Sequence, residues 1–364
     1  MTPVRIGVVG LGYWGPNLAR NLQELDCAEL AAICDADRSR LDAVSRRFTG
    51  ARTYEHLDDL LADDEIDAVA IATPVSTHFP IGRASLEAGK HVFVEKPLAA
   101  SSRECLELIR LADERDLVVM PGHTFLYSPP VVAVRRLIEQ GALGKIYFIS
   151  TSRVNLGLHQ ADVSVTWDLG PHDFSILRYW LGEPPIAVSA LTRGFVVPAI
   201  PDVAFIDLEF ASGTIAHVEL SWLAPSKLRR TTVVGSEKMV VYDDTSTEPV
   251  RIFDSGVELK EPETFGEYQL TYRAGDIVSP RMDVAEPLSL ELRDFCDAIV
   301  SGATPRSSAA VGLEVVRTIE AVDDSEASGG MRISVDLLDP LGLTRGYAQP
   351  REVRRVLDDG PLAG

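Results

Sequence analysis

A glycine-rich turn near the start of the chain constrains the fold more than any other feature of the sequence. The apolar run Val4–Val9 leads directly into Gly10-Leu11-Gly12-Tyr13-Trp14-Gly15, a G-x-G-x-x-G pattern, and a helical pattern begins at Pro16. The first glycine permits a tight turn, the second lets the backbone approach a bound pyrophosphate, and the third lets helix and strand pack closely. The free N–H groups of the first helical turn favour phosphate. Strand, turn and helix in direct succession therefore predict a dinucleotide-binding unit.

The first third of the chain continues as strands and helices in alternation. Apolar runs at 30–34, 68–72, 91–94 and 117–120 are interspersed with helical patterns at 38–48, 79–88 and 103–115. Strands that are apolar throughout lie in parallel sheets that helices cover on both faces. We therefore predict an α/β fold in which residues 1–123 form a Rossmann domain with a doubly wound parallel sheet.

The pattern changes at Thr124, and 364 residues are too many for one ordinary core. A helix at 129–140 precedes alternating strands at 205–210, 214–222, 231–242 and 250–253, with turns at 212–213 and 254–256, and helical patterns return at 288–300 and 309–322. Antiparallel strands of this kind can leave one face of a sheet uncovered. Residues 124–364 are therefore predicted to form a C-terminal α+β domain with an open, mainly antiparallel sheet. We expect the last five residues to fray.

The choice of cofactor depends on Asp35, which ends the second strand 25 residues after Gly10. A carboxylate at this position accepts hydrogen bonds from the adenosine ribose and repels a 2′-phosphate, so it favours NAD over NADP. Two alternatives stay open. Asp35 or Asp37 can cap the helix that follows, and Arg38 can pair with a 2′-phosphate. We expect NAD as the cofactor.

A lysine follows the strand at 91–94, within Glu95-Lys96-Pro97. The carboxyl ends of the strands in a doubly wound sheet face the ligand crevice, so we expect Lys96 to point to where the nicotinamide lies. Pro97 favours an extended conformation for the lysine. The alternative is an ordinary solvated lysine.

A second group of polar residues lies in Trp167-Asp168-Leu169-Gly170-Pro171-His172-Asp173. Pro171 marks the start of an amphipathic helix that we expect at 174–181. Asp168 and His172 are then four residues apart at its first turn and share one face. A histidine titrates near neutral pH, as a general base for an alcohol must. The alternative is a capping aspartate beside a structural histidine.

These segments together resemble the Gfo/Idh/MocA oxidoreductases. The resemblance rests on the N-terminal G-x-G-x-x-G, on AGKHVFVEKPLA, on WDLGPHDFSILRYWLG and on EPLSLELRDFCDAI, in this order over nearly the whole chain. It implies that Lys96, Asp168 and His172 line one active site, in which the histidine is the acid/base and the lysine orients the substrate hydroxyl. It also implies a cis Lys96–Pro97 peptide and a homodimer or homotetramer built by the C-terminal sheet.

The motifs and the resemblance give two sets of binding residues. The cofactor is expected to contact Gly10, Gly12, Tyr13, Trp14, Gly15, Asp35, Arg38, Thr73, Pro74, His78, Glu95 and Lys96. The substrate is expected to contact His123, Arg153, Asn155, Trp167, Lys227 and Arg229. For His78 the alternative is a residue at a helix start with no direct contact.

A narrower resemblance concerns the substrate. Arg153-Val154-Asn155-Leu156-Gly157, WDLGPHD and SWLAPSKLRRTTVVGSEKMVVYDD are similar to a branch of the family that contains nucleotide-sugar 3-dehydrogenases. The branch implies an NAD-dependent transfer of hydride between nicotinamide and a secondary hydroxyl or ketone of a sugar, at the 3-position of a nucleotide-linked one. An inositol or free-sugar dehydrogenase is the alternative among enzymes. A non-catalytic NAD-binding sensor is the alternative from another class.

A basic cluster would suit a phosphate-bearing substrate. Lys227, Arg229 and Arg230 follow one another closely, and in an extended segment Lys227 and Arg229 share a face while Arg230 points away. A guanidinium can bind two phosphate oxygens at once. The alternative is a solvated strand edge or a salt bridge between subunits.

Composition excludes several other classes of protein. With 54 acidic and 35 basic side chains the net charge is −19, which disfavours nucleic-acid binding. No apolar run approaches the roughly 20 residues of a membrane-spanning helix, and the first residues lack the pattern of a signal peptide. The four cysteines, Cys27, Cys34, Cys105 and Cys296, lack the spacing of a zinc site. We expect a cytoplasmic protein with reduced thiols, without a metal and without nucleic-acid or membrane partners.

Overall fold

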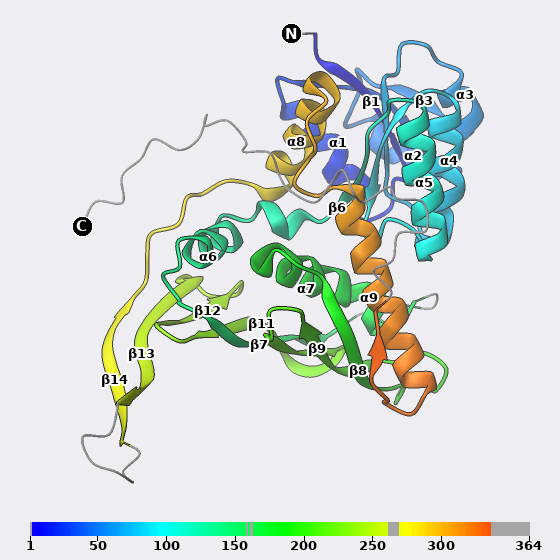
Figure 1. The fold of residues 1–364 in the computed structure, drawn as a ribbon. Coiled ribbons are helices and arrows are strands. Elements are labelled where there is room, and N and C mark those ends of the chain that lie inside the picture. The colour runs from blue at the N-terminus through cyan, green and yellow to red at the C-terminus, as the bar shows by residue number, and fades with distance from the viewer. Residues whose placement is uncertain (1, 158, 161–162, 261–268, 336–364) are drawn as a thin grey trace.

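The structure, a computed structural model, describes residues 2–157, 159–160, 163–260 and 269–335, which are built around two separate sheets (Figure 1). The first sheet and its helices comprise β1 (Val4–Val9), α1 (Gly15–Glu24), β2 (Ala28–Cys34), α2 (Arg38–Ser45), β3 (Arg52–Tyr54), α3 (Leu57–Leu61), β4 (Ala68–Ile71), α4 (His78–Glu87), β5 (His91–Glu95), α5 (Ser102–Glu114) and β6 (Val119–Gly122). Its six strands are parallel, in the order β3-β2-β1-β4-β5-β6. The predicted doubly wound sheet is confirmed.

The turn after β1 requires its glycines. Gly10 has a φ of +91°, and a Cβ there would lie 2.6 Å from Cγ2 of Thr73. A Cβ on Gly15 would lie 2.0 Å from the carbonyl oxygen of Gly10, because α1 starts directly beside the strand. A Cβ on Gly12 would meet no atom within 4 Å. The turn therefore leaves open space in front of the N-terminus of α1, where a phosphate can approach.

The second sheet belongs to the C-terminal part. Its elements are α6 (Pro129–Glu139), β7 (Ile146–Leu156), α7 (Val165–Leu181), β8 (Pro185–Arg193), β9 (Val203–Phe210), β10 (Ile215–Ser221), β11 (Leu223–Gly235), β12 (Met239–Asp243), β13 (Val250–Lys260), β14 (Gln269–Val278), α8 (Pro287–Ser301), α9 (Ala309–Ala327) and β15 (Ile333–Ser334). The strand order is β14-β13-β12-β11-β7-β10-β9-β8-β15. Among the described residues of this sheet, only β7 and β10 pair in parallel. The mainly antiparallel sheet is confirmed.

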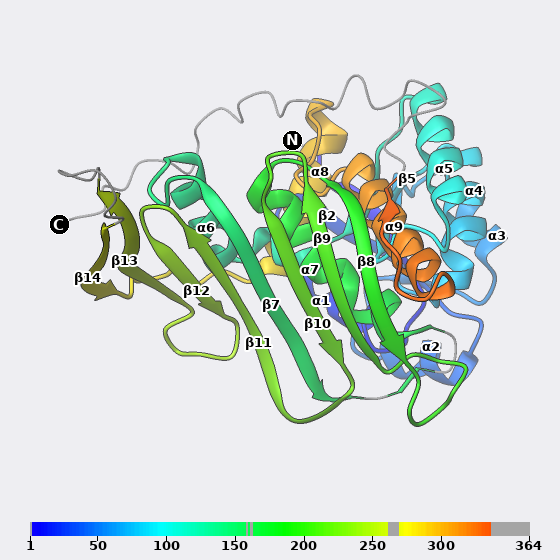
Figure 2. The ribbon, with the colours of Figure 1, turned by 60° about the horizontal axis from the view of Figure 1, so that its bottom comes forward.

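Helices cover one face of this second sheet. Core residues of α6, α7 and α9, among them Val134, Leu177 and Ile319, pack on the strands from that side. Figure 2 shows the opposite face, where the strands β8, β9, β10, β7 and β11 lie uncovered toward the viewer. The prediction of an open sheet is therefore confirmed.

Helices α8 and α9 return to the first sheet. Leu292 and Phe295 of α8 pack in the core that includes β1 and α1. Helix α9 contributes Leu313 to the N-terminal core and Val315 to the C-terminal core. The last helix thus packs on both sheets, and it helps to hold α7 close to the carboxyl ends of the parallel strands.

Two local predictions are wrong. Helix α7 begins at Val165, with the Ser164 side chain as its N-cap, so Pro171 lies inside the helix rather than at its start. A proline inside a helix lacks the N–H that would bond the carbonyl four residues earlier, here that of Trp167, and its ring crowds that carbonyl. The turn expected at 254–256 is part of β13, where Gly256 pairs with Arg273 of β14. A Cβ on Gly256 would lie 3.0 Å from that arginine, so the glycine serves close packing.

The end of the chain falls only partly within the described residues. The expected irregular tail after Gly329 includes the short strand β15, and the last five residues, expected to fray, lie outside the described residues. No described helix is long and apolar enough to cross a membrane.

Candidate active site

Lys96 and Asp168 meet where the two sheets approach each other. Lys96 follows β5, and its Nζ donates hydrogen bonds to the carbonyl oxygen of Asp168 at 2.7 Å and to its Oδ1 at 3.1 Å. Nε1 of Trp222 donates to the other carboxylate oxygen at 3.2 Å. The Lys96–Pro97 peptide is cis, as predicted. Asp168 therefore holds the ammonium group in a fixed place at the carboxyl end of the parallel sheet.

His172 lies one turn further along α7, beside the same lysine. Its Nδ1 is buried and has no hydrogen-bond partner among the described residues. Burial, assisted by the positive charges of Lys96, Arg153 and Arg229, holds the pKa of His172 well below its usual range. The imidazole is therefore neutral at physiological pH and able to accept a proton.

Two arginines border the histidine. Arg153 on β7 and Arg229 on β11 occupy paired positions of neighbouring strands. Arg153 is buried and binds Asp173 through Nε at 2.6 Å, whereas the half-buried Arg229 binds Asp244 at 3.0 Å. Both charges act on His172, so the structure brings these two predicted residues to the site.

Three other predicted substrate residues lie on β11, β7 and α7. Lys227 is exposed, and Asn155 lies two residues after Arg153 on β7. Nε1 of Trp167 donates to Asp323 of α9 at 2.9 Å. Trp167 and Asp323 line a separate cavity of about 340 Å³.

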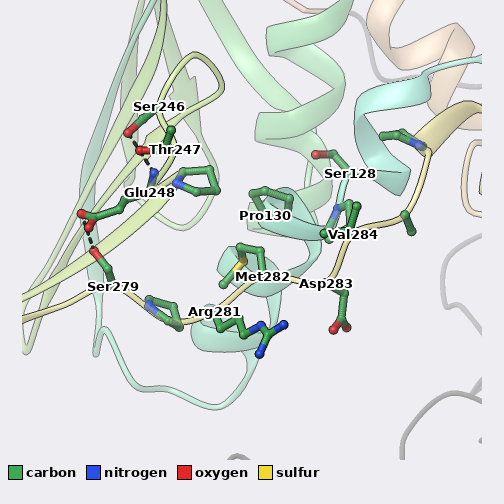
Figure 3. Close-up of a pocket in the computed structure, with 15 residues that line it drawn as sticks. Ser128, Pro130, Ser246, Thr247, Glu248, Ser279, Arg281, Met282, Asp283 and Val284 are labelled. Carbon is green, nitrogen blue, oxygen red and sulfur yellow. Dashed lines mark hydrogen bonds between the residues drawn. The ribbon is translucent and has the colours of Figure 1, made fainter.

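A larger cavity, of about 560 Å³, lies between Pro130, Glu248 and Met282, and none of the candidate site residues lines it (Figure 3).

The cofactor residues surround the glycine turn. Asp35 accepts hydrogen bonds from the backbone N–H of Leu11 at 2.7 Å and of Asp37 at 2.8 Å. Asp37, not Asp35, caps α2. Arg38 pairs with Glu55 at 2.5 Å. The Asp35 carboxylate keeps lone pairs free for ribose hydroxyls.

Two aromatic side chains and a histidine are also among the residues expected to contact the cofactor. Tyr13 is exposed and lies edge-on to the half-exposed ring of Trp14. His78 is buried, with Nδ1 and Nε2 at 2.8 and 2.9 Å from the carbonyl oxygens of Pro97 and Thr73. His78 thus lies between two loops of the site, and the cofactor contacts expected of His78, Thr73 and Pro74 stay predictions.

Three buried titratable groups lie behind Lys96. Burial raises the pKa of Glu95 to about 7 and lowers that of His123 to about 3. Burial also raises the pKa of Glu291 on α8 well above its ordinary value, and Thr124 donates a hydrogen bond to this carboxyl at 2.7 Å. The prediction named Glu95 and His123 but missed Glu291. Glu291 could have been found as a glutamate that lies within the apolar stripe of a predicted helix.

Comparison with known proteins gives two family matches. Residues 4–123 match the oxidoreductase family described as GFO_IDH_MocA, with an NAD-binding Rossmann fold, and residues 131–241 match the GFO/IDH/MocA C-terminal domain. These two stretches contain every predicted site residue.

Individual relatives differ in the substrates that their names give. Inositol 2-dehydrogenase 1 of Saccharopolyspora erythraea is 32% identical over 60% of this chain and 67% of that protein. UDP-N-acetylglucosamine 3-dehydrogenase of Acidithiobacillus ferrooxidans is 28% identical over 67% of this chain and 75% of that protein. The chain spans slightly less than two thirds of two other curated relatives, 62% and 66%.

A solved structure extends the likeness to the whole fold. The crystal structure of GenD2 from gentamicin A biosynthesis, in complex with NAD, superposes with a TM-score of 0.78 at 27% identity, over 92% of this chain and 97% of that one. The fold and the NAD-binding family therefore agree.

Proposed function

The chain belongs to the GFO/IDH/MocA family of oxidoreductases, and on this basis we propose that it is an NAD-dependent dehydrogenase of a sugar. The observation that carries the proposal is the contact of Lys96 with Asp168 beside the half-buried His172, whose Nδ1 is buried and whose pKa is lowered. Hydride transfer from an alcohol requires a base for the hydroxyl proton, a positive charge near the oxygen and a site that holds the cofactor. This edge of the sheet offers a histidine, a fixed lysine and a phosphate-binding turn for these tasks.

The residues of the site fit NAD, and each has a separate role in binding or in proton transfer. The open space over Gly12 and the free lone pairs of Asp35 suit a pyrophosphate and a ribose. NAD, when bound, supplies the hydride acceptor. His172 accepts the hydroxyl proton at Nε2, since its Nδ1 is buried. Lys96 donates a hydrogen bond to the same oxygen and stabilises its developing negative charge, while Asp168 positions the lysine.

For the substrate we propose a nucleotide-linked sugar oxidised at its 3-position. Arg229 is half-buried next to the histidine, and the exposed Lys227 lies on the same strand, so a phosphate group can meet both. The similarity to the UDP-N-acetylglucosamine 3-dehydrogenase supports this choice. The half-buried Asn155 is left for a sugar hydroxyl, whereas His123 is buried behind Lys96.

An inositol or free sugar is the second candidate. Lys96, Arg153 and Arg229 are each paired with a carboxylate, so the buried site has little uncompensated positive charge for an anion. The similarity to inositol dehydrogenases favours the same alternative. Initial rates of NAD reduction with UDP-N-acetylglucosamine, myo-inositol and free glucose distinguish the candidates. Binding of NAD without turnover of any of them would favour the sensor instead.

The acid–base role of His172 is tested by substitution. Replacing a positioned acid/base typically slows a reaction by about 10² to 10⁴. His172→Ala should lower kcat by about that factor and leave the dissociation constant for NAD nearly unchanged. His56→Ala, at an exposed histidine before α3, is the control. A variant at His172 with near-normal turnover would contradict the role.

We further propose that the protein is a homodimer or homotetramer paired through the open sheet face. Phe148, Leu191, Phe205 and Ile215 are each at least 42% exposed on strands of that sheet. Exposed apolar side chains gathered on one face are typical of a protein interface.

A further inference from the structure

Phe125 is in contact with three groups of the site, one on each of three elements. It lies on the short 3-10 helix at Thr124–Tyr127, directly after His123 and Thr124. Its ring lies edge to face with the His172 imidazole, with ring centres 4.9 Å apart at 73°. The guanidinium carbons of Arg153 and Arg229 lie 4.7 and 5.9 Å from its centre.

The neighbours of Phe125 hold it in place. Thr124 donates a hydrogen bond to Glu291, and the hydroxyl of Tyr127 donates to Asp294 at 2.6 Å. Both acceptors belong to α8, which packs on the N-terminal core. The backbone on either side of Phe125 is therefore anchored, and the ring cannot move freely away from the site.

The ring lies beside two nitrogen-bearing groups that each leave one buried atom without a hydrogen-bond partner. Nη1 of Arg153 and Nδ1 of His172 are both buried without a hydrogen-bond partner among the described residues. Cations are attracted to the face of an aromatic ring, and imidazole and phenyl rings favour the edge-to-face arrangement. One side chain thus contacts three groups from β7, β11 and α7.

We propose that Phe125 is a positioning residue, whose ring holds the His172 imidazole and two guanidinium groups in one arrangement and keeps water from that side of the histidine. The inference rests on the proposed acid–base role of His172. Charged or titratable groups face this histidine from every neighbouring element: Lys96 after β5, His123 before the 3-10 helix, Arg153 on β7, Arg229 on β11, and Asp168 and Asp173 on α7 itself.

The consequence concerns the protonation of His172. Burial is the largest cause of its lowered pKa, ahead of the surrounding cations. A small side chain at position 125 would admit water, which stabilises the imidazolium, so the pKa of His172 would rise toward its ordinary value. The neutral base would then be lost at higher pH than in the wild type.

Histidine NMR on the full-length chain tests this directly. In the ¹⁵N-histidine-labelled wild type, the His172 signal, assigned with His172→Gln, should stay that of a neutral ring at pH values where an ordinary histidine is already protonated. In Phe125→Ala it should titrate at least about one pH unit higher than in the wild type, and in Phe125→Leu, which keeps apolar bulk, clearly less. Leu137→Ala, a half-buried core position on α6, is the control that should leave the signal unchanged.

Kinetics give the second readout. For Phe125→Ala the acidic limb of the kcat/KM profile should move to higher pH with the NMR titration, and KM for NAD should stay within about twofold. An unshifted His172 titration in both Phe125 variants, folded by circular dichroism, overturns the inference. Near-normal turnover in His172→Ala instead contradicts the acid–base role of His172 on which the inference rests, so the two failures are distinct.

Discussion

Nζ of Lys96 donates hydrogen bonds to both the carbonyl oxygen and the carboxylate of Asp168, across the boundary between the two domains. The lysine belongs to the end of a parallel strand and the aspartate to a helix that packs on the other sheet. The distance from the cofactor turn to the base on α7 is therefore fixed at this contact. A change in the pair should affect the reaction more than the binding of either ligand.

Asp168→Asn tests the pair. The amide can still accept a bond from Trp222, but it removes the charge that holds the lysine, and charge-assisted hydrogen bonds are about twice as strong as neutral ones. We expect kcat to fall by about 10- to 100-fold, with little change in the affinity for NAD. Asp323→Asn is a matched control, because Asp323 also accepts a bond from an indole, that of Trp167. Equal losses in both variants would contradict a specific role for Asp168.

Spacing in the sequence indicated Lys96, Asp168 and His172 separately, and the resemblance to the family implied that they lie together. The position after a buried strand gave Lys96, and an interval of four residues gave Asp168 and His172 on one helix face, although the helix begins earlier than Pro171 indicated. Phe125 could not be found in this way. An aromatic residue in a short apolar stretch looks like any core residue until the chain folds and places β7, β11 and α7 around it.

The cofactor preference is tested at Asp35. Its carboxylate is oriented by the Leu11 N–H, and Arg38 is engaged by Glu55, so the site favours ribose hydroxyls over a 2′-phosphate. Hydrogen bonds to charged groups contribute about 1.5–3 kcal/mol. Asp35→Ala should therefore weaken NAD binding by about 10- to 100-fold in calorimetry. Asp37→Ala, which removes only the helix cap, should leave the affinity near normal. Tighter binding of NADP than of NAD by the wild type would exclude the assignment.

The proposed phosphate contact is tested by neighbouring arginines. Arg229 faces His172, whereas Arg230 points to the other side of β11 and pairs with Asp243. Arg229→Ala should raise the KM for a nucleotide sugar about tenfold or more and leave that for a free sugar unchanged, because only the former carries phosphate. Arg230→Ala should change neither. If Arg229→Ala affects both substrates equally, the free-sugar alternative becomes the better one.

The pH dependence of stability is tested at Glu291. Its pKa is raised by burial, so the folded chain keeps the proton to higher pH than the unfolded chain does. Its contribution is fully present below the ordinary pKa of a glutamate and is lost as the pH rises through the folded-state value. Glutamine cannot ionise. The melting temperature of Glu291→Gln, relative to the wild type, should therefore increase from about pH 5.5 to about pH 8.5, with about 1.4 kcal/mol for each unit of pKa shift.

Controls make this comparison specific. Glu286→Gln, at the exposed start of α8, removes a carboxylate whose pKa is instead lowered, mainly by its hydrogen bond with Arg20. Its effect on the melting temperature should be the same from about pH 5.5 to about pH 8.5, because Glu286 is charged in both the folded and the unfolded chain over this range. A difference between Glu291→Gln and the wild type that does not change with pH would show that Glu291 is ionised when folded.

The open sheet face gives the last prediction. Leu191 and Phe205 are directly paired on β8 and β9, and they are 60% and 42% exposed on the face that no described helix covers. On a two-fold symmetric interface each substitution occurs twice, and in a chain of net charge −19 an added carboxylate increases the repulsion between copies. The wild type should therefore have the mass of a dimer or tetramer in light scattering at micromolar concentration, and Phe205→Glu should shift it toward the monomer. Val300→Glu, at an equally exposed apolar residue on α8, should leave the mass unchanged. A monomeric wild type would refute pairing through this face. An oligomer that resists Phe205→Glu would locate the interface on another surface.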